Sequence, residues 1–230
     1  MSEKRKIVIK VTGNMFDFPE DLFFKDFIKL VVNLHKDHNI IIITGGGKNA
    51  RNYIKLARNF RVNEATLDEI GIFVSRINAK LLISCLGTVA YKFIPESLNE
   101  VEHGYDSGKV VVCGGMNPGQ STNAVATLIA EKIGAELLIN ASEIDGVYTS
   151  DPKINKNAKK LDKVTVNQLH KILEGNTSAA GTYELLDPVA LKIIQRSKIP
   201  VVLGKCSVEF IRDVVKGKSV GTKVMSNSEK

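Results

Sequence analysis

Short apolar runs alternate with longer amphipathic segments along most of this chain. Six runs rich in β-branched residues predict strands at residues 6–12, 40–44, 109–113, 136–140, 201–203 and 221–225. Apolar residues at spacings of three and four predict helices at residues 21–38, 49–60, 64–86, 122–133, 165–173, 188–196 and 208–216. The alternation predicts an α/β protein, a three-layer αβα sandwich with a mainly parallel central sheet.

The longest predicted helix, residues 64–86, has an apolar stripe close to a heptad pattern, formed by Leu67, Ile70, Val74, Ile77 and Leu81. The stripe fits either the core or an interface between subunits. We expect its polar residues on other faces, Asp68, Arg76 and Asn78, to lie in solvent. Residues 98–106 are expected to form an acidic connection.

Four predicted strands run directly into turns that suit a ligand. The turns contain Gly13, the glycines at 45–47, the glycine-rich stretch 114–119 and residues 141–148. Ligands bind beyond the carboxyl ends of the strands in an open parallel sheet, so we expect the four turns to gather along one edge. Glycine lets an anion approach bare backbone amides, which indicates phosphate binding at the 45–47 turn.

Lys10 lies inside the first predicted strand, three residues before Gly13. A lysine buried in a strand is costly unless an anion meets it, so this position indicates a functional ammonium group. The alternative is an edge-strand lysine that points to water. Lys48 and Arg51 add positive charge just after the second turn.

Composition narrows the class of protein. At 230 residues, with 43% hydrophobic and 25% charged residues, the chain fits one large soluble domain. No apolar run approaches the roughly 20 residues that span a bilayer, and the N-terminus lacks the pattern of a signal peptide. We therefore expect a cytoplasmic protein with no membrane partner. The three widely spaced cysteines are expected to be buried thiols: Cys85, Cys113 and Cys206.

The net charge of +7 indicates an anionic partner. The basic residues are scattered and no basic stripe is interleaved with aromatic residues, so a small anion fits better than a nucleic acid. No P-loop, dinucleotide fingerprint or nucleophile elbow is present. The four histidines lie away from the glycine turns: His35, His38, His103 and His170.

Phosphoryl transfer onto an existing phosphate needs no histidine base, because a phosphomonoester is largely dianionic at neutral pH. Catalysis then depends on positioning and on positive charge around the moving group. Lys10, Arg51, the glycine amides and a Mg²⁺ ion bound by the phosphates would supply that charge.

The residues in these turns identify a family. The chain resembles uridylate (UMP) kinases of the archaeal type, within the amino-acid-kinase superfamily, over residues 6–224. The matching motifs are Lys10-x-x-Gly13, Gly45-Gly46-Gly47-x-x-x-Arg51, Asp68-x-x-Gly71, Gly114-Gly115-x-x-Pro118-Gly119-x-x-Thr122, Asp145-Gly146-Val147-Tyr148 with Asp151-Pro152, and Asp187-Pro188-x-Ala190. The resemblance implies the amino-acid-kinase fold and transfer of the ATP γ-phosphoryl group to UMP.

The resemblance also implies roles for single residues. Lys10 would be catalytic and Asp145 would orient it. The implied ATP-binding residues are Lys10, Thr12, Gly13, Gly47, Arg51, Ser142, Tyr148 and Asp151. The implied UMP-binding residues are Gly46, Asp68, Met116, Asn117, Pro118, Gly119, Gln120, Ser121 and Thr122. Mg²⁺ would be held by the nucleotide phosphates, with no metal site made by the protein.

The resemblance further implies one domain over residues 1–230, with an acceptor-binding half at 1–135 and an ATP-binding half at 136–225, and a homohexamer built from dimers. Two residues depart from the family pattern. Asn14 stands where some relatives place a second cation, and Glu143 puts a carboxylate near the expected ATP site. Two alternatives remain open: the same fold with a different acceptor, and a nucleotide-binding subunit without catalytic activity.

Overall fold

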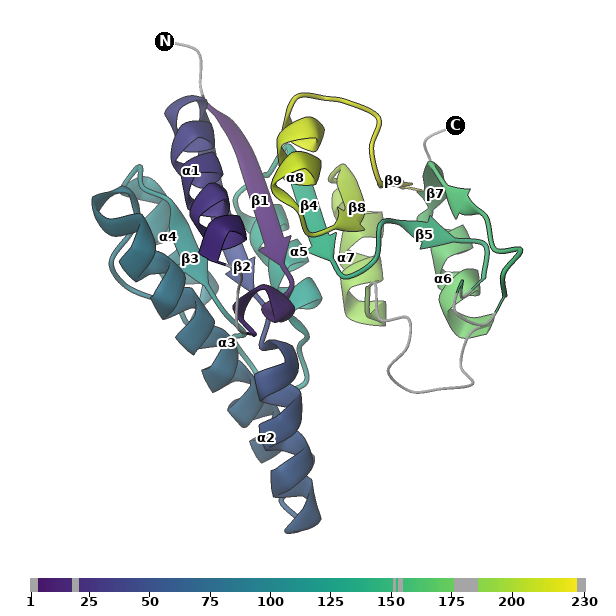
Figure 1. Cartoon of the computed structure of the whole chain (residues 1–230), viewed down its shortest axis with the longest axis horizontal. Helices are drawn as coiled ribbons and strands as arrows, with labels where there is room; N and C mark the ends of the chain where they lie inside the picture. The colour runs from purple at the N-terminus through teal and green to yellow at the C-terminus, as the bar shows by residue number, and fades with distance from the viewer. Residues whose placement is uncertain (1–3, 18–20, 151, 153–154, 176–185, 227–230) are drawn as a thin grey trace.

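The computed structural model describes residues 4–17, 21–150, 152, 155–175 and 186–226. A seven-stranded sheet runs through the molecule in the order β3-β2-β1-β4-β8-β9-β7 (Figure 1). All pairs in it are parallel except the antiparallel pair β8–β9. The mainly parallel sheet expected from the sequence is confirmed.

The strands of this sheet are β1 (Arg5–Val11), β2 (His38–Thr44), β3 (Val111–Cys113), β4 (Leu137–Ser142), β7 (Lys163–Thr165), β8 (Val201–Lys205) and β9 (Thr222–Met225). The central strands β1, β2 and β4 each contain a run of buried apolar residues, 7–9, 40–43 and 137–139, as strands covered on both faces require. A separate antiparallel pair joins β5 (Val147–Tyr148) to β6 (Lys160–Leu161).

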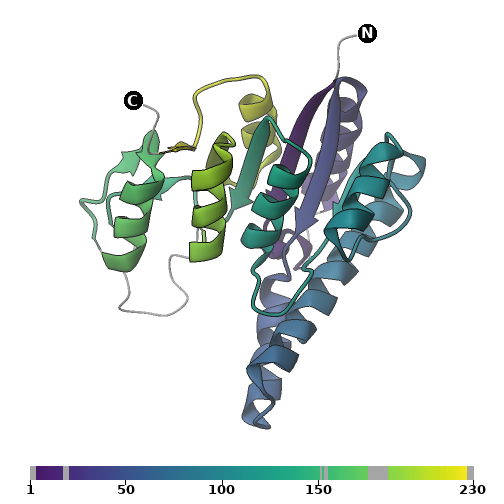
Figure 2. The same cartoon turned by 180° about the vertical axis from the view of Figure 1, so that it is seen from behind.

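Helices cover both faces of the sheet, which gives the three layers (Figures 1 and 2). One core contains residues of α1 (Asp21–Asp37), α3 (Glu64–Leu86) and α8 (Val208–Val215). The other contains residues of α4 (Leu98–Asp106), α5 (Thr122–Lys132), α6 (Val166–Gly175) and α7 (Pro188–Ser197). Alternate residues of β1 enter the two cores, Ile7 and Ile9 on one side and Val8 on the other, as the two-residue period of a strand dictates.

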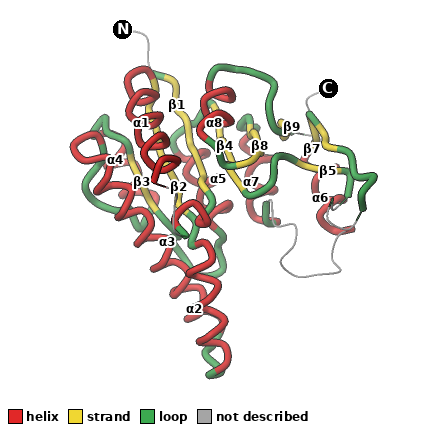
Figure 3. The backbone as a smooth tube through the Cα atoms, viewed as in Figure 1, coloured by secondary structure: helices red, strands yellow, loops and turns green. Residues whose placement is uncertain are grey.

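The helical hairpin of α2 (Gly47–Asn59) and α3 extends beyond the sheet, as the tube in Figure 3 makes plain. The segment Glu64–Val89, which comprises α3 and the 3-10 turn η2 (Gly87–Val89), has the length and composition of a membrane span. In this fold it packs on α2 and the sheet, and Leu67, Ala79 and Leu82 are buried. We interpret α3 as a core helix of the domain.

Two expectations about local structure were wrong, and three short strands were not predicted. Residues 98–106 form α4 and not an acidic connection: the Ser97 hydroxyl accepts a hydrogen bond from the Glu100 amide, and the Glu100 side chain accepts one from the amide of Glu96. This resembles a capping box, a pattern visible in the sequence. The short strands β5, β6 and β7 were not expected. Cys85 is exposed because α3 leaves one side uncovered, whereas Cys113 is buried and Cys206 half-buried.

Candidate functional site

The four turns lie at one edge of the sheet. Strands β3, β2, β1 and β4 are consecutive neighbours and run parallel, so the turns that follow them leave the sheet on the same side. The gathering expected from the sequence is confirmed. A small cavity of about 230 Å³ lies at this edge and is lined by Thr12, Met15, Phe23, Ser142, Glu143, Lys205 and Cys206.

Two of the glycine turns pack backbone against backbone. A Cβ atom on Gly13 would lie 1.9 Å from the amide nitrogen of Gly47, and one on Gly47 would lie 2.5 Å from the carbonyl oxygen of Gly13. Gly47 also has a φ of +69°, which side chains rarely adopt. The amide of Gly45 donates to the Val11 carbonyl at 3.1 Å. These glycines therefore permit the ends of β1 and β2 to meet without a gap.

Lys10 lies half-buried near the end of β1, between Ile43 of β2 and Asn140 of β4. Burial lowers the pKa of its ammonium group to about 8, and the opposing influence of Cys206 and Glu143 restores only part of the loss. At neutral pH the group is still charged. Its position at the gathered turns makes it a cation available to an anionic ligand.

The N-terminus of α2 is capped by a side chain from another turn. Gly46 stands at the cap position and has no side chain, and the Asp17 carboxylate accepts hydrogen bonds from the amides of Lys48 at 2.5 Å and Asn49 at 3.2 Å. Asp17 follows the 3-10 turn η1 (Gly13–Phe16), so it ties the first turn to the second. The amides of Lys48 and Asn49, just after the turn expected to bind phosphate, therefore have partners within the protein, and the Lys48 side chain is exposed.

A polar bridge crosses the same edge from α2 to the turn after β4. The Arg51 guanidinium group donates to the side-chain oxygen of Asn14 at 2.8 Å, and the Asn14 amide group donates to the Glu143 carboxylate. The two residues that depart from the family pattern thus contact each other. The Thr12 hydroxyl accepts a hydrogen bond from the Asn14 amide nitrogen and fixes the turn that places Asn14 in the bridge.

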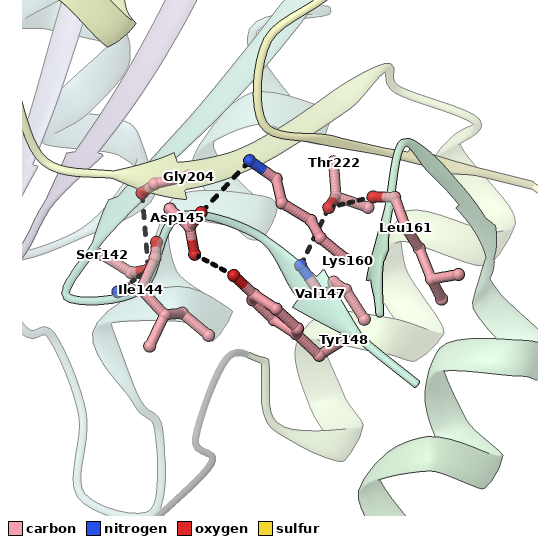
Figure 4. Close-up of polar contacts among 9 residues, drawn as sticks. All are labelled: Ser142, Ile144, Asp145, Val147, Tyr148, Lys160, Leu161, Gly204 and Thr222. Atoms are coloured by element: carbon pink, nitrogen blue, oxygen red, sulfur yellow. Dashed lines mark hydrogen bonds and ion pairs between the residues drawn. The ribbon is translucent and has the colours of Figure 1, made fainter. Parts of the chain in front are cut away.

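The carboxylate of Asp145 lies between Tyr148 and Lys160 (Figure 4). It accepts the Tyr148 hydroxyl at 2.9 Å and contacts the Lys160 ammonium group at 3.3 Å. Partial burial alone would raise the pKa of Asp145, but these two contacts outweigh it and lower the pKa. The hydrogen bond to Asp145 raises the pKa of Tyr148. The resemblance assigned Asp145 to orienting Lys10, whereas its contacts in this structure are with β5 and β6.

Ser142, at the end of β4, is buried and its hydroxyl lies near the carbonyl oxygens of Ile144, at 3.1 Å, and Gly204, at 3.4 Å (Figure 4). It shapes the turn and joins β4 to β8. Asp151, the remaining expected ATP-binding residue, lies outside the described residues.

The segment 114–121 connects β3 to α5. It is named here the acceptor loop, after the role that the resemblance implies for it. Met116 is buried at its base, whereas Asn117, Pro118 and Gly119 are exposed at its tip. Gly119 has a φ of +78°, and the Gln120 amide donates to the Asn117 carbonyl at 3.2 Å, so a turn shapes the tip. Half-buried Gln120 and Thr122 follow this turn.

Helix α3 holds the acceptor loop, and two of the three polar residues expected in solvent are instead enclosed. The amide group of Asn78 is buried and donates to the Gly45 carbonyl at 2.8 Å. Arg76 donates to the carbonyls of the loop. Asp68 is exposed, but it accepts the Gly119 amide at 2.7 Å. Helical periodicity could not reveal these contacts because it does not show that the loop lies against α3.

The end of the acceptor loop is linked to α7. The Ser121 hydroxyl caps α5 by accepting the amides of Asn123 and Ala124, each at 3.1 Å, and it donates to the Asp187 carboxylate. Asp187 caps α7 in the same way through the amides of Val189 and Ala190. Two helix N-termini, each with a partial positive charge, therefore face the same edge.

Two sets of polar groups therefore lie at this edge of the sheet. Lys10, Arg51 and the Ser142–Tyr148 segment provide cations and hydroxyl groups that suit an anionic ligand, and Asp68 and the acceptor loop form the second set. Among the described residues, no group of three or more His, Cys, Asp or Glu side chains is arranged to hold a metal ion.

Comparison with known proteins agrees with this architecture. The model of the Amino acid kinase family matches residues 5–205. A uridylate kinase of Sulfurisphaera tokodaii is 46% identical over 222 residues, which are 94% of this chain and 97% of that protein. A uridylate kinase of Metallosphaera sedula is 48% identical over 200 residues, which are 86% of this chain and 88% of that protein.

Solved structures agree as well. The crystal structure of uridylate kinase from Archaeoglobus fulgidus superposes with a TM-score of 0.87 at 38% identity, and covers 95% of this chain and 99% of that one. The family match, over residues 5–205, spans the four turns. The chain belongs to the amino acid kinase family.

Proposed function

We propose that this protein is a uridylate kinase, which transfers the γ-phosphoryl group of ATP to UMP to give UDP and ADP. The observation that favours it is the gathering of Lys10, Arg51, the glycine turns and the acceptor loop at one edge of the parallel sheet. Relatives 46% and 48% identical to this chain are named uridylate kinases. The domain would divide into an acceptor half, residues 1–135, and a donor half, residues 136–225.

In the proposed reaction, a phosphate oxygen of UMP attacks the γ-phosphorus of ATP. The new P–O bond forms as the bond between the γ-phosphorus and the bridging oxygen breaks, and ADP leaves with that electron pair. No proton has to be removed from the attacking oxygen at neutral pH. Lys10 would neutralise charge on the transferred group, and Arg51 would leave Asn14 to contact the ATP phosphates.

Mg²⁺ would enter with ATP, bound by the phosphates and not by a cage of protein side chains. When bound, it would supply positive charge across the β- and γ-phosphates. Lys10, Arg51 and the backbone amides at the Gly13 and Gly47 turns would orient the same phosphates from the protein side.

We also propose that the protein acts in the cytoplasm and self-associates through α3, with a hexamer built from dimers as the expected assembly. Phe73, Ile77 and Leu81 recur every four residues on α3 and are 60%, 65% and 43% exposed. An apolar stripe of this kind is typical of an interface between subunits.

The test is turnover with Mg²⁺ and ATP when each nucleoside monophosphate is offered in turn. We expect ADP release with UMP to exceed that with AMP, GMP or CMP. Asp68→Asn should raise the Michaelis constant for UMP far more than that for ATP, since Asp68 lies only on the acceptor side. A protein that binds ATP but releases no ADP with any of the four would refute the enzymatic assignment, and preference for another acceptor would correct the substrate.

A further inference from the structure

The acceptor loop has little regular structure of its own, yet it must present a fixed surface to a ligand. Among the described residues it is anchored to α3 at its base and at its tip. At the base the Ser75 hydroxyl accepts the Gly115 amide at 2.8 Å and donates to the Ile72 carbonyl at 2.7 Å. At the tip Asp68 accepts the Gly119 amide at 2.7 Å.

Arg76 is a further anchor, and it contacts the loop at two carbonyls. Its Nε atom donates to the Gly115 carbonyl at 3.1 Å and its Nη2 atom to the Met116 carbonyl at 3.3 Å. Both carbonyls belong to the stretch just after β3, where the ladder with β2 has ended at Cys113. The planar guanidinium group holds the two carbonyls in a fixed relation, which a single ammonium group cannot reproduce.

The charge of Arg76 is balanced away from the loop. Its Nη1 atom donates to the Glu96 carboxylate at 2.7 Å, and the Arg76 side chain is only 15% exposed. The Glu96 amide in turn donates to the Glu100 side chain at 2.8 Å, in the first turn of α4. Each of the three guanidinium nitrogens therefore already has a partner in the protein.

We infer that Arg76 is a positioning residue for the acceptor, which acts by fixing the base of the acceptor loop through the Gly115 and Met116 carbonyls. The inference deepens the proposed function and rests on it for the identity of the acceptor. The contacts themselves do not depend on it. Without Arg76 two enclosed carbonyls lose a charged donor, so the loop should open more often even when no nucleotide is present.

The first measurement is hydrogen exchange at the backbone amides of segment 114–120, all of whose residues except Pro118 carry an amide hydrogen, in the ligand-free protein. Arg76→Met should speed exchange of these amides about tenfold, as expected for loss of a charge-assisted hydrogen bond. The exchange rate in Arg76→Lys should lie between the rates in the parent protein and in Arg76→Met. Glu96→Gln should have a smaller effect than Arg76→Met, because the hydrogen bonds from Arg76 to the carbonyls remain. Circular dichroism and thermal melting would establish that each variant is folded.

The second measurement is kinetic. Arg76→Met should raise the Michaelis constant for UMP about tenfold while that for ATP stays the same. The control is Arg58→Met, which removes the same charge from an exposed arginine paired with Glu64 on the α2–α3 hairpin. It should change neither the loop exchange nor either constant.

Two results would overturn the inference. Unchanged exchange in residues 114–120 of Arg76→Met would show that Arg76 does not hold the loop, and a rise in the constant for UMP would then indicate direct contact with the acceptor. Equal rises in both Michaelis constants would show a general structural effect. Should the protein fail to phosphorylate UMP, the exchange experiment would still decide whether Arg76 fixes the loop.

Discussion

At the scale of single residues, Lys10 shows how a charged group at the end of a central strand can destabilise the fold. Its ammonium group sits half-buried at the end of β1, and burial lowers its pKa from 10.5 to about 8. Below pH 8 the group is charged in both the folded and the unfolded chain, so the folded protein bears the full cost of enclosing it. An anionic ligand would remove that cost, which explains why such a residue is tolerated.

Lys10→Met should therefore abolish phosphoryl transfer and yet stabilise the ligand-free protein. At pH 7 we expect the free energy of unfolding to rise by about 1–3 kcal/mol, up to the value of the pKa shift. Between pH 8 and 10.5 the unfolded chain binds more protons than the folded one, so the parent protein gains stability as the pH rises and the difference shrinks. Urea denaturation of both proteins at pH 7 and pH 10 measures this.

The matched control is Lys48→Met, which removes a neighbouring but exposed ammonium group and should leave stability nearly unchanged at both pH values. A Lys10→Met protein less stable than its parent at pH 7 would contradict the interpretation. So would a difference that does not depend on pH.

The sequence allowed Lys10 to be singled out because a lysine among β-branched residues breaks the pattern of a buried strand. It did not allow the Arg51–Asn14–Glu143 bridge to be predicted. Asn14 and Glu143 are 129 positions apart and belong to separate turns, and their contact arises only from the pairing of β1 with β4. The contact between Asp145 and Lys160 could not be predicted either, because Lys160 lies on a short strand, β6, that the hydrophobic pattern does not indicate.

At the scale of secondary-structure elements, the sides of α3 differ in what they contact, although helical periodicity predicts a single apolar stripe. Leu67 and Val74 of the expected stripe are buried, whereas Ile77 and Leu81 are exposed beside Phe73. Another side of the same helix contacts the acceptor loop through Asp68, Ser75 and Arg76. Periodicity located the helix correctly, but neighbouring elements decide which side becomes core, anchor or free surface.

Ile77→Glu should weaken self-association, because it places a charge in the middle of the exposed apolar side. We expect a smaller mass by light scattering at micromolar protein, and a thermal stability that depends less on protein concentration. Leu22→Glu is the control: it puts the same charge at an apolar residue 71% exposed on α1. Identical masses for Ile77→Glu and the parent across a dilution series would exclude this side of α3 as the interface.

At the scale of the whole molecule, the sheet joins the two halves. Strand β4 belongs to the second half of the chain but lies between β1 and β8, and Ile139 pairs with Ile9 on one side and Val202 on the other. The parallel order was predictable from alternating strands and helices. The insertion of β4 beside β1 was not, because strand order depends on contacts distant in sequence.

Because one continuous sheet joins the two halves of the chain, we expect the protein to unfold as a single cooperative unit. Ile139→Ala deletes an apolar group that is fully buried in the middle of the sheet, so it should lower the free energy of unfolding by about 2–5 kcal/mol. If the sheet unfolds as a whole, native-state hydrogen exchange should show the same loss of protection at Ile42 in β2 and at Val202 in β8. Val189→Ala, at an exposed position of α7, is the control and should change neither amide. Lost protection confined to β8 and its neighbours would contradict this prediction, because it would mean that the second half of the chain opens on its own.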